Sequence, residues 1–406
     1  MNRPSGFVPD GGSTTVEDAI AELGRKIGRI DRTETVAVRE ATGRVLAEPI
    51  EVERPQPHYR RSNRDGYAIR ARDTAGATAA EPTFLETTDG PVGDGEATWV
   101  HTGSAVPEGA DAVVMVESVE ETGEGITVTE PVASGTHVTP IGADFEVGAQ
   151  LYEAAHRLRP GDLGALRVAG IRAVPVVEPP EVAVVPTGEE LVGSDPGPGE
   201  VVETNGLVGS MLVEHWCGHA RYRDVVTDEE DALGAAIDRE LDADLIVTTG
   251  GSSVGSRDLL PAVVADRGEV VVDGLALRPG HSAGIGVVSG TPIAMLPGTP
   301  IAAMVVAWVL VRPALGGAAG TAVVDPPTVR ATLPDGLESE QGHRTVHGLS
   351  LEEPTKTGES PTARVAPRGG LPSLGEIDGW VQVEEARTEI PSTEIITVER
   401  WGEGSC

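Results

Sequence analysis

Residues 244–258 have the sequence Asp-Leu-Ile-Val-Thr-Thr-Gly-Gly-Ser-Ser-Val-Gly-Ser-Arg-Asp, and this stretch decides the fold. The apolar run that ends at Val247 predicts a buried strand of a parallel sheet. A loop of glycine and serine follows, and Leu259–Ala265 is expected to form a helix with Pro261 in its first turn. A strand, a loop of small residues and a helix amino end together favour an anion site, because backbone N–H groups and the helix dipole both attract negative charge.

The loop also supplies candidate ligands. Backbone N–H groups of Gly250, Gly251, Ser252 and Ser253 can approach a phosphate closely, and Asp258 is placed to hold a cation that bridges to that phosphate. Taken alone, such a loop is just as typical of a plain crossover turn, so the surrounding sequence has to decide.

Strand and helix patterns alternate through residues 179–320. Strands are expected at 182–185, 222–226 and 245–248, and helices at 206–217, 229–241, 259–265 and, as a buried apolar helix, 301–311. Alternation of this kind predicts a parallel sheet covered by crossover helices, with ligands bound at the carboxyl ends of the strands.

The remaining segments have β character. Residues 51–137 are rich in Gly, Pro, Thr and short β-branched runs, which predicts a small β domain. After Pro326-Pro327 the helical pattern ends, and the rest of the chain is expected to form a small β-barrel. Short helices are predicted at Val16–Leu23, capped by Thr14 or Thr15, and at Leu163–Val168.

The composition excludes several partners. The 406 residues carry 64 acidic and 31 basic side chains, only two of them lysine, for a net charge of −33. Such a surface repels nucleic acid and anionic membranes and suits high salt, so a halophilic source is predicted. Cys217 and Cys406 form no metal or redox motif, and the apolar run 301–311 is too short to cross a bilayer. We therefore expect a cytoplasmic protein.

Carboxylates follow three of the predicted strands. Glu190, Asp228 and Asp258 would then share one rim of the sheet, where carboxylate and phosphate oxygens could hold Mg²⁺. Because acidic loops are expected throughout so acidic a chain, solvated surface charge remains the alternative.

Two cationic segments suggest anionic ligands. Arg60, Arg61 and Arg64 are crowded into five positions, although pairing with the acidic surface explains them equally well. Arg278-Pro279-Gly280-His281 combines a cation, a turn and a second group that can become cationic. The nearby turn Pro297-Gly298-Thr299-Pro300 is rigid and could line a pocket.

Five motifs, in this order and spacing, resemble the molybdopterin molybdenumtransferase family, which includes the C-terminal enzyme domain of gephyrin. The motifs are Asp65-Gly66-Tyr67-Ala68, Thr102-Gly103 with Pro107–Val114, Thr187–Leu191, Gly250–Gly255 with Asp258, and Leu296–Pro300. The resemblance extends from about residue 14 to 400.

The resemblance implies an α/β multidomain fold and a homodimer of four-domain subunits. The domains would be an elongated linker (14–50 and 138–178), a small β domain (51–137), a three-layer molybdopterin-binding domain (179–320) and a C-terminal β-barrel (321–406). The substrates would be adenylylated molybdopterin and molybdate: the adenylyl bond is hydrolysed with Mg²⁺, AMP leaves, and the metal enters the dithiolene. Molybdoenzymes that accept the product would be possible partners.

Residue roles carry over by motif. Asp65 and Thr102 would come from the partner subunit, and Glu190, Asp228 and Asp258 from the sheet domain, with Asp228 and Asp258 as metal ligands. The cofactor-binding residues would be Gly250, Gly251, Ser252, Ser253, Arg278, His281, Pro297, Gly298 and Pro300.

This chain departs from the family where the oxyanion should bind. The family's Lys-Pro-Gly-Lys-Pro is Arg278-Pro279-Gly280-His281-Ser282 here, and a family Gly-Arg pattern is Gly342-His343-Arg344. A tungstate-specific enzyme and a non-inserting carrier or regulator that binds molybdopterin-type ligands therefore remain alternatives. A molybdopterin-adenylylating enzyme is a third, which the four-domain layout disfavours.

Overall fold

The computed structural model describes residues 13–216, 218–250, 259–320, 326–354, 360–366, 375–392 and 394–400. Gly251, Ser252, Ser253 and Asp258 of the candidate loop lie outside the described residues, as do Cys217 and Cys406. The chain divides into two units, Met1–Glu34 with Gly43–Val45 and Val176–Cys406, and Thr35–Thr42 with Leu46–Pro175. Each unit is described by itself.

A six-stranded mixed sheet forms the centre of the first unit. Its order is β16 (His219–Tyr222), β13 (Glu181–Pro186), β17 (Leu245–Thr249), β21 (Thr291–Leu296), β20 (Gly284–Val288) and β18 (Gly268–Asp273). The first four strands are parallel, and β20 and β18 add antiparallel pairs at one edge. Every residue of β17 is buried, which confirms the buried parallel strand predicted there.

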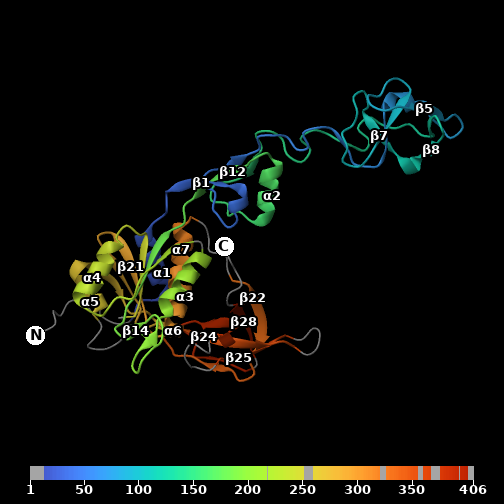
Figure 1. Cartoon of the computed structure of the whole chain (residues 1–406). Coiled ribbons are helices and arrows are strands. Elements are labelled where there is room, and N and C mark those ends of the chain that lie inside the picture. The colour runs from blue at the N-terminus through green and yellow to red at the C-terminus, as the bar shows by residue number, and fades with distance from the viewer. Residues whose placement is uncertain are drawn as a thin grey trace, which may run out of the picture. The chain divides into compact units, whose positions relative to one another are not determined.

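Helices cover both faces of this sheet (Figure 1). Alternate residues of each strand face opposite layers, so Val182 and Val184 belong to one apolar cluster and Ala183 and Val185 to the other. The first cluster includes α1 (Val16–Ile27), α3 (Asn205–His215), α6 (Pro300–Val306), the π-helical turn η4 (Ala307–Val311) and α7 (Arg312–Ala318). The second includes α4 (Glu230–Arg239) and α5 (Leu260–Arg267). The predicted three-layer α/β domain is therefore present.

The apolar helix is longer than the sequence indicated. Pro300–Ala318 is continuous over 19 residues and, by length and composition, could cross a membrane. In the structure 78% of its apolar window is buried inside the protein, as expected for a core helix. The predicted span 301–311 missed the last turns, because Pro313 occupies an early position of α7, where its missing N–H is tolerated.

Two further predictions need adjustment. The strand expected at 222–226 is His219–Tyr222, because Glu181–Val184 of β13 pair with these residues and Val226 makes only an isolated bridge to Thr187. The second adjustment concerns residues 14–50, which were expected to begin the elongated linker domain. Helix α1 lies in this range but packs within the first unit, against the α/β domain. Its amino end is capped by the Thr15 side chain, which accepts the Asp18 N–H at 3.2 Å. The domain boundaries from the resemblance otherwise stay a prediction.

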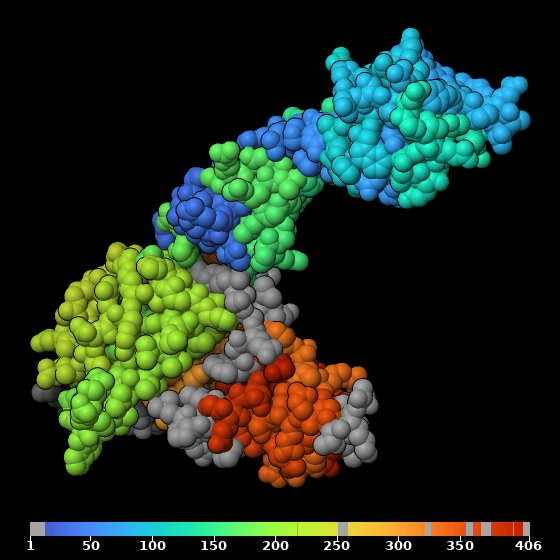
Figure 2. Space-filling view, turned by 45° about the vertical axis from the view of Figure 1, so that its right-hand side comes forward, coloured from blue at the N-terminus to red at the C-terminus, as the bar shows by residue number. Residues whose placement is uncertain are grey.

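The C-terminal strands form a sheet that closes on itself. Strands β22 (Thr328–Thr332), β24 (Arg344–Glu352), β25 (Thr362–Val365), β26 (Gly379–Val383) and β28 (Ile395–Arg400) pair in a ring, because β24 pairs with both β25 and β26. Short strands β23 (Leu337–Glu338) and β27 (Glu389–Ile390) pair beside it. Strand β19 (Leu277–Arg278), from the α/β domain, pairs in parallel with β24. In Figure 2 these strands, orange to red, lie against the yellow-green α/β domain.

The second unit contains a six-stranded sheet, which confirms β structure within the segment 51–137. Its order is β7 (Ala112–Met115), β4 (Gly66–Ile69), β6 (Glu96–Val100), β5 (Thr83–Thr87), β9 (Gly125–Val128) and β8 (Val119–Glu121). The smaller elements of the chain are β1 (Thr33–Ala37), β2 (Ile50–Glu51), β3 (Arg61–Ser62), β10 (Val138–Thr139), β11 (Gln150–Tyr152), β12 (Ala173–Val177), β14 (Leu191–Val192), β15 (Val201–Val202), α2 (Pro160–Val168) and the 3-10 turns η1 (Val38–Glu40), η2 (Ala71–Thr74) and η3 (Val116–Ser118).

Candidate functional site

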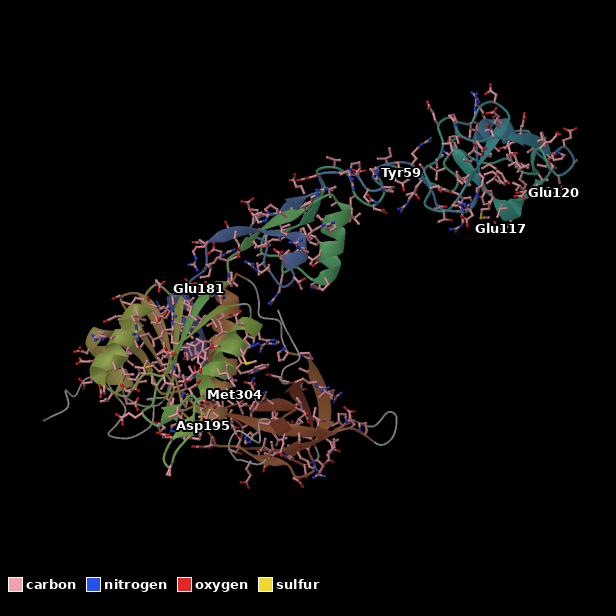
Figure 3. All side chains as sticks on the ribbon, viewed as in Figure 1. Tyr59, Glu117, Glu120, Glu181, Asp195 and Met304 are labelled. Atoms are coloured by element: carbon pink, nitrogen blue, oxygen red, sulfur yellow. The ribbon has the colours of Figure 1, made fainter. Side chains whose placement is uncertain are left out.

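The strand order creates a crevice between β13 and β17. The chain passes from β13 to β16 on one side and later returns to β17 on the other, so the connections diverge beyond the carboxyl ends of β13 and β17. Ligands of open α/β sheets bind at such a switch point. In Figure 3, Glu181 at the start of β13 and Asp195 in the segment beyond its end mark opposite ends of the domain, and the crevice lies at the Asp195 end.

Backbone segments meet closely in this crevice. The Thr187 N–H donates to the Thr249 carbonyl at 3.0 Å, and the Gly250 N–H donates to the Leu296 carbonyl at 3.1 Å. Gly250 has φ +109°, and a Cβ placed there would lie 2.1 Å from the Thr187 carbonyl oxygen. Only glycine fits at position 250, because any side chain there would collide with the Thr187 carbonyl. The first residue of the predicted small-residue loop is therefore required for the close approach of these two backbone segments.

Two buried hydroxyls point to a ligand or water in the crevice. Thr187 and Thr249 are 1% and 2% exposed, and their Oγ1 atoms have no hydrogen-bond partner in the part of the chain that the structure describes. Leaving such a group unsatisfied costs about 1–3 kcal/mol. Both hydroxyls belong to the strand ends that form the switch point.

The predicted carboxylates Glu190 and Asp228 are brought together at the same rim. Residue 226 bridges to Thr187, which places the segment around Asp228 beside the segment 188–190. One Asp228 carboxylate oxygen is buried without a partner among the described residues, and the group accepts the Glu189 backbone N–H. Burial, and next the negative charge of Glu190, raise the pKa of Asp228.

A divalent cation would relieve this repulsion. Among the residues described, no set of three or more His, Cys, Asp or Glu side chains is arranged to hold a metal. Mg²⁺ commonly takes only one or two carboxylates and completes its shell with phosphate oxygens and water. The unpartnered oxygen of Asp228 beside Glu190 fits that donor set, whereas the other predicted ligand, Asp258, lies outside the described residues.

Glu203, which no sequence motif singled out, is buried near this rim and is only 7% exposed. Its carboxylate accepts the N–H groups of Gly206 and Leu207 at 2.6 and 3.3 Å and the Tyr222 hydroxyl. Burial and the Glu203 contact raise the pKa of Tyr222 to about 12. Because Glu203 already occupies the amino end of α3, that helix end is not the anion site.

The turn after β21 lies beside the crevice. The Asn205 side chain donates to the Gly298 carbonyl at 2.7 Å, and a Cβ on Gly298 would lie 3.5 Å from the Gly250 Cα. Pro297 begins this turn directly after β21 ends at Leu296, and Pro300 ends the turn as the first residue of α6. The predicted turn therefore does adjoin the predicted loop.

A second cluster joins the α/β domain to the C-terminal strands. Because β19 pairs with β24, Arg278 is opposite Thr345, and its Nε donates to Glu340 at 3.3 Å. The Nδ1 atom of His343 lies 3.4 Å from the other Glu340 oxygen. Burial lowers the pKa of His281, and the charges of Arg278 and His343 lower it further. His343 was noted only as a departure from the family, but the fold brings it to the predicted Arg278 and His281.

A cavity of about 580 Å³ opens next to this cluster. Its walls include Arg278, Pro300, Glu340, Val346 and Trp380, so a mainly apolar pocket has charged groups at its edge. Cavities of this size accommodate small organic ligands.

Asp65 and Thr102, also predicted for the site, lie together in the second unit. The Thr102 N–H donates to Asp65 Oδ1 at 2.7 Å, and this bond is the main reason that the pKa of Asp65 is lowered. Nearby, Arg60 donates to the Ala110 carbonyl and Arg61 contacts Asp144. Those two arginines are therefore engaged within the protein.

Known proteins match this chain over most of its length. A model described as the MoeA N-terminal region (domain I and II) matches residues 14–170, and one described as a probable molybdopterin binding domain matches residues 183–317. Molybdopterin molybdenumtransferase 2 of Mycobacterium tuberculosis (strain CDC 1551 / Oshkosh) is 31% identical over 348 residues, covering 81% of this chain and 86% of the relative.

Two other relatives agree. Molybdopterin molybdenumtransferase of Bacillus subtilis (strain 168) is 34% identical and covers 69% of each chain. The crystal structure of the molybdopterin biosynthesis MoeA protein from Pyrococcus horikoshii OT3 is 28% identical, with a TM-score of 0.79, and covers 96% of this chain and all of that one. Fold and site thus define a multidomain protein with a molybdopterin-binding type of α/β domain. The chain belongs to the molybdopterin molybdenumtransferase family.

Proposed function

We propose that this protein completes the molybdenum cofactor: it hydrolyses adenylylated molybdopterin, releases AMP and inserts molybdate into the dithiolene. The observation that carries the proposal is the crevice between β13 and β17. There, two buried hydroxyls without a hydrogen-bond partner among the described residues lie with the closely packed Gly250 and the Glu190–Asp228 pair. A phosphoanhydride with a divalent cation supplies the hydrogen-bonding and charge partners that these groups lack.

The residues have distinct tasks in this proposal. The Gly250 N–H already donates to the Leu296 carbonyl, so the backbone N–H groups of Gly251, Ser252 and Ser253 would hold a phosphate, and the Thr187 and Thr249 hydroxyls would orient it. Asp228, with Asp258, would hold Mg²⁺, and Glu190 would orient the attacking water. The cation, when bound, neutralises charge on the phosphate oxygens as the bond between adenylate and molybdopterin phosphate breaks.

Asp65 and Thr102 act from a second subunit in this proposal. They belong to a unit separate from the Glu190–Asp228 rim, and the family resemblance implies a homodimer with a shared site. A cytoplasmic location, a halophilic source and transfer of the product to molybdoenzymes are part of the same proposal and follow from composition and family.

The oxyanion would bind at Arg278, with His281 and His343 nearby. Arg278 presents a planar fork where the family has a point-charge lysine. Its contact with Glu340 has to be displaced by molybdate, so we expect weaker oxyanion binding than a lysine pair would give. The adjoining cavity, walled by Trp380 and Val346, would receive the organic part of the ligand.

The test compares the oxyanion dependence of AMP release in two arginine variants. Arg278→Gln is expected to raise the molybdate concentration for half-maximal AMP release by about tenfold or more, since a charge-assisted contact contributes ~1.5–3 kcal/mol. Arg330→Gln, on the exposed side of β22, is the matched control and should change nothing. An equal response of the two variants would remove Arg278 from the oxyanion site.

A tungstate-specific enzyme would show the same dependence with tungstate only. A carrier or regulator would bind adenylylated molybdopterin without releasing AMP.

A further inference from the structure

Two neighbouring strands of the second unit place four side chains in a row. The antiparallel register of β4 and β6 sets Tyr67 opposite Trp99 and Gly66 opposite Val100. Continued by one more pair, the same register sets Asp65 opposite His101. Residues two apart on a strand share a face, so Asp65 and Tyr67 lie on the same face as Trp99 and His101.

The contacts follow that register. The Trp99 ring meets the Tyr67 ring edge-on with centroids 5.1 Å apart, and meets the His101 ring edge-on at 5.6 Å. The Tyr67 hydroxyl donates to Glu121 at 2.7 Å, which fixes the inner end of the row. At the outer end, His101 Nδ1 lies 3.7 Å from Asp65 Oδ1.

The indole of Trp99 selects one form of His101. The Trp99 Nε1–H group lies 3.3 Å from His101 Nε2, and an indole nitrogen can only donate. Nε2 must therefore accept, which leaves the proton of the neutral imidazole on Nδ1, the atom that faces Asp65. A 3.7 Å separation is longer than a hydrogen bond, as is common for site contacts that tighten when ligand binds.

Thr102 and His101 both approach the Oδ1 atom of the Asp65 carboxylate. Both the Thr102 N–H and His101 Nδ1 address Oδ1, and the Asp65 backbone carbonyl accepts the Val116 N–H at 3.3 Å. The Thr102 side chain also hydrogen-bonds the Asp65 carboxylate, so Thr102 and His101 together hold this group.

We propose that His101 is a positioning residue for Asp65: Trp99 holds the imidazole with its proton on Nδ1, and this N–H, directed at Oδ1, fixes the orientation of the Asp65 carboxylate for the adenylylated ligand. The inference rests on the proposed function, in which Asp65 acts from the second subunit. The sequence carries the pattern as Asp65-Gly-Tyr67 and Trp99-Val-His101.

The charged surroundings of this row are few in the described structure. Asp65, the residue just before β4, lies beside His101, and Glu121 of β8 accepts from Tyr67 at the far end. Arg64 precedes Asp65 in the chain and donates to the Asn63 carbonyl. His101 is largely exposed, so its environment is set by Asp65 and Trp99 and not by burial.

The first experiment reads the tautomer directly and requires no activity. The full chain, labelled with ¹⁵N-histidine, has nine histidines, and the His101 signals are assigned by their loss in His101→Gln. The proposal predicts the Nδ1–H form at neutral pH in the wild type and a shift toward Nε2–H in Trp99→Phe. His58, which contacts Tyr59 edge-on, serves as the internal control. An Nε2–H form in the wild type, or no change in Trp99→Phe, overturns the proposal.

The second experiment measures AMP release and compares two amide variants. Asn at position 101 can present an N–H near the place of Nδ1, whereas Gln presents it near Nε2. We expect His101→Asn to retain kcat within about threefold and His101→Gln to lose about tenfold to a hundredfold, as a misplaced group does. Equal activity of the two variants overturns the positioning role. A wild type that releases no AMP contradicts the proposed function, while the tautomer measurement still decides the role of His101.

Discussion

Replacing Gly250 with alanine tests whether the switch-point crevice is as tight as the structure indicates. Alanine at φ +109° is strained, and its Cβ would lie 2.1 Å from the Thr187 carbonyl oxygen, inside any allowed contact. The backbone strain costs about 1–2 kcal/mol. Displacing the strand end costs a further ~1–3 kcal/mol, as for overpacking in a core.

Gly290→Ala is the control that carries the backbone strain without the steric clash. Gly290 lies in the β20–β21 hairpin with φ +93°, and a Cβ there would meet nothing within 4 Å. The loss of glycine flexibility in the unfolded chain is the same for both variants, so it cancels in their difference. The difference therefore reports the clash with Thr187 alone.

Denaturant unfolding, followed by tryptophan fluorescence, provides the assay. Trp216 and Trp308 lie edge-on in the core of the α/β domain with centroids 6.1 Å apart, so they report on this domain. Gly250→Ala should lower the free energy of unfolding by ~1–3 kcal/mol more than Gly290→Ala. Equal losses in the two variants would refute the close approach of Gly250 to Thr187.

Three further outcomes are expected. Asp228→Asn should stabilise the protein at neutral pH and abolish Mg²⁺-dependent AMP release. Burial and the charge of Glu190 raise the pKa of Asp228 in the folded state. The wild-type carboxyl therefore lowers the free energy of unfolding as the pH rises from its unfolded-state pKa through its folded-state pKa. Denaturation of wild type and variant across that pH range checks this, and parallel curves would contradict it. Tyr222→Phe should lower the free energy of unfolding by about 1.5–3 kcal/mol, because the buried Glu203 carboxylate loses the Tyr222 hydroxyl as a hydrogen-bond donor. An unchanged denaturant midpoint would show that Glu203 is satisfied without Tyr222. The thermal midpoint should rise as KCl is added, because salt screens a net charge of −33, and a midpoint that falls with KCl would contradict this repulsion.

Local patterns were enough to predict the elements that form the site. The buried strand before Gly250, the helix after it with Pro261 in its first turn, and the carboxylates after the strands all follow from short sequence windows. That the small-residue loop approaches a phosphate stays a prediction: at Gly250 the close contact is with a protein carbonyl, and Gly251, Ser252 and Ser253 lie outside the described residues.

Non-local pairing explains what the sequence did not reveal. The strand expected at 222–226 shifted to His219–Tyr222 because its register depends on β13, some forty residues away. His343 joins Arg278 only through the pairing of β19 with β24. The Asp65–His101 contact likewise depends on the β4–β6 register, which no local window contains.

The most direct test of the central claim is a single-turnover reaction of the wild-type protein with adenylylated molybdopterin, Mg²⁺ and molybdate in high salt. We expect AMP to be released only when an oxyanion is present, and molybdenum then to be found on the molybdopterin. Tight binding of the adenylylated ligand with no AMP release, with or without molybdate, would contradict it.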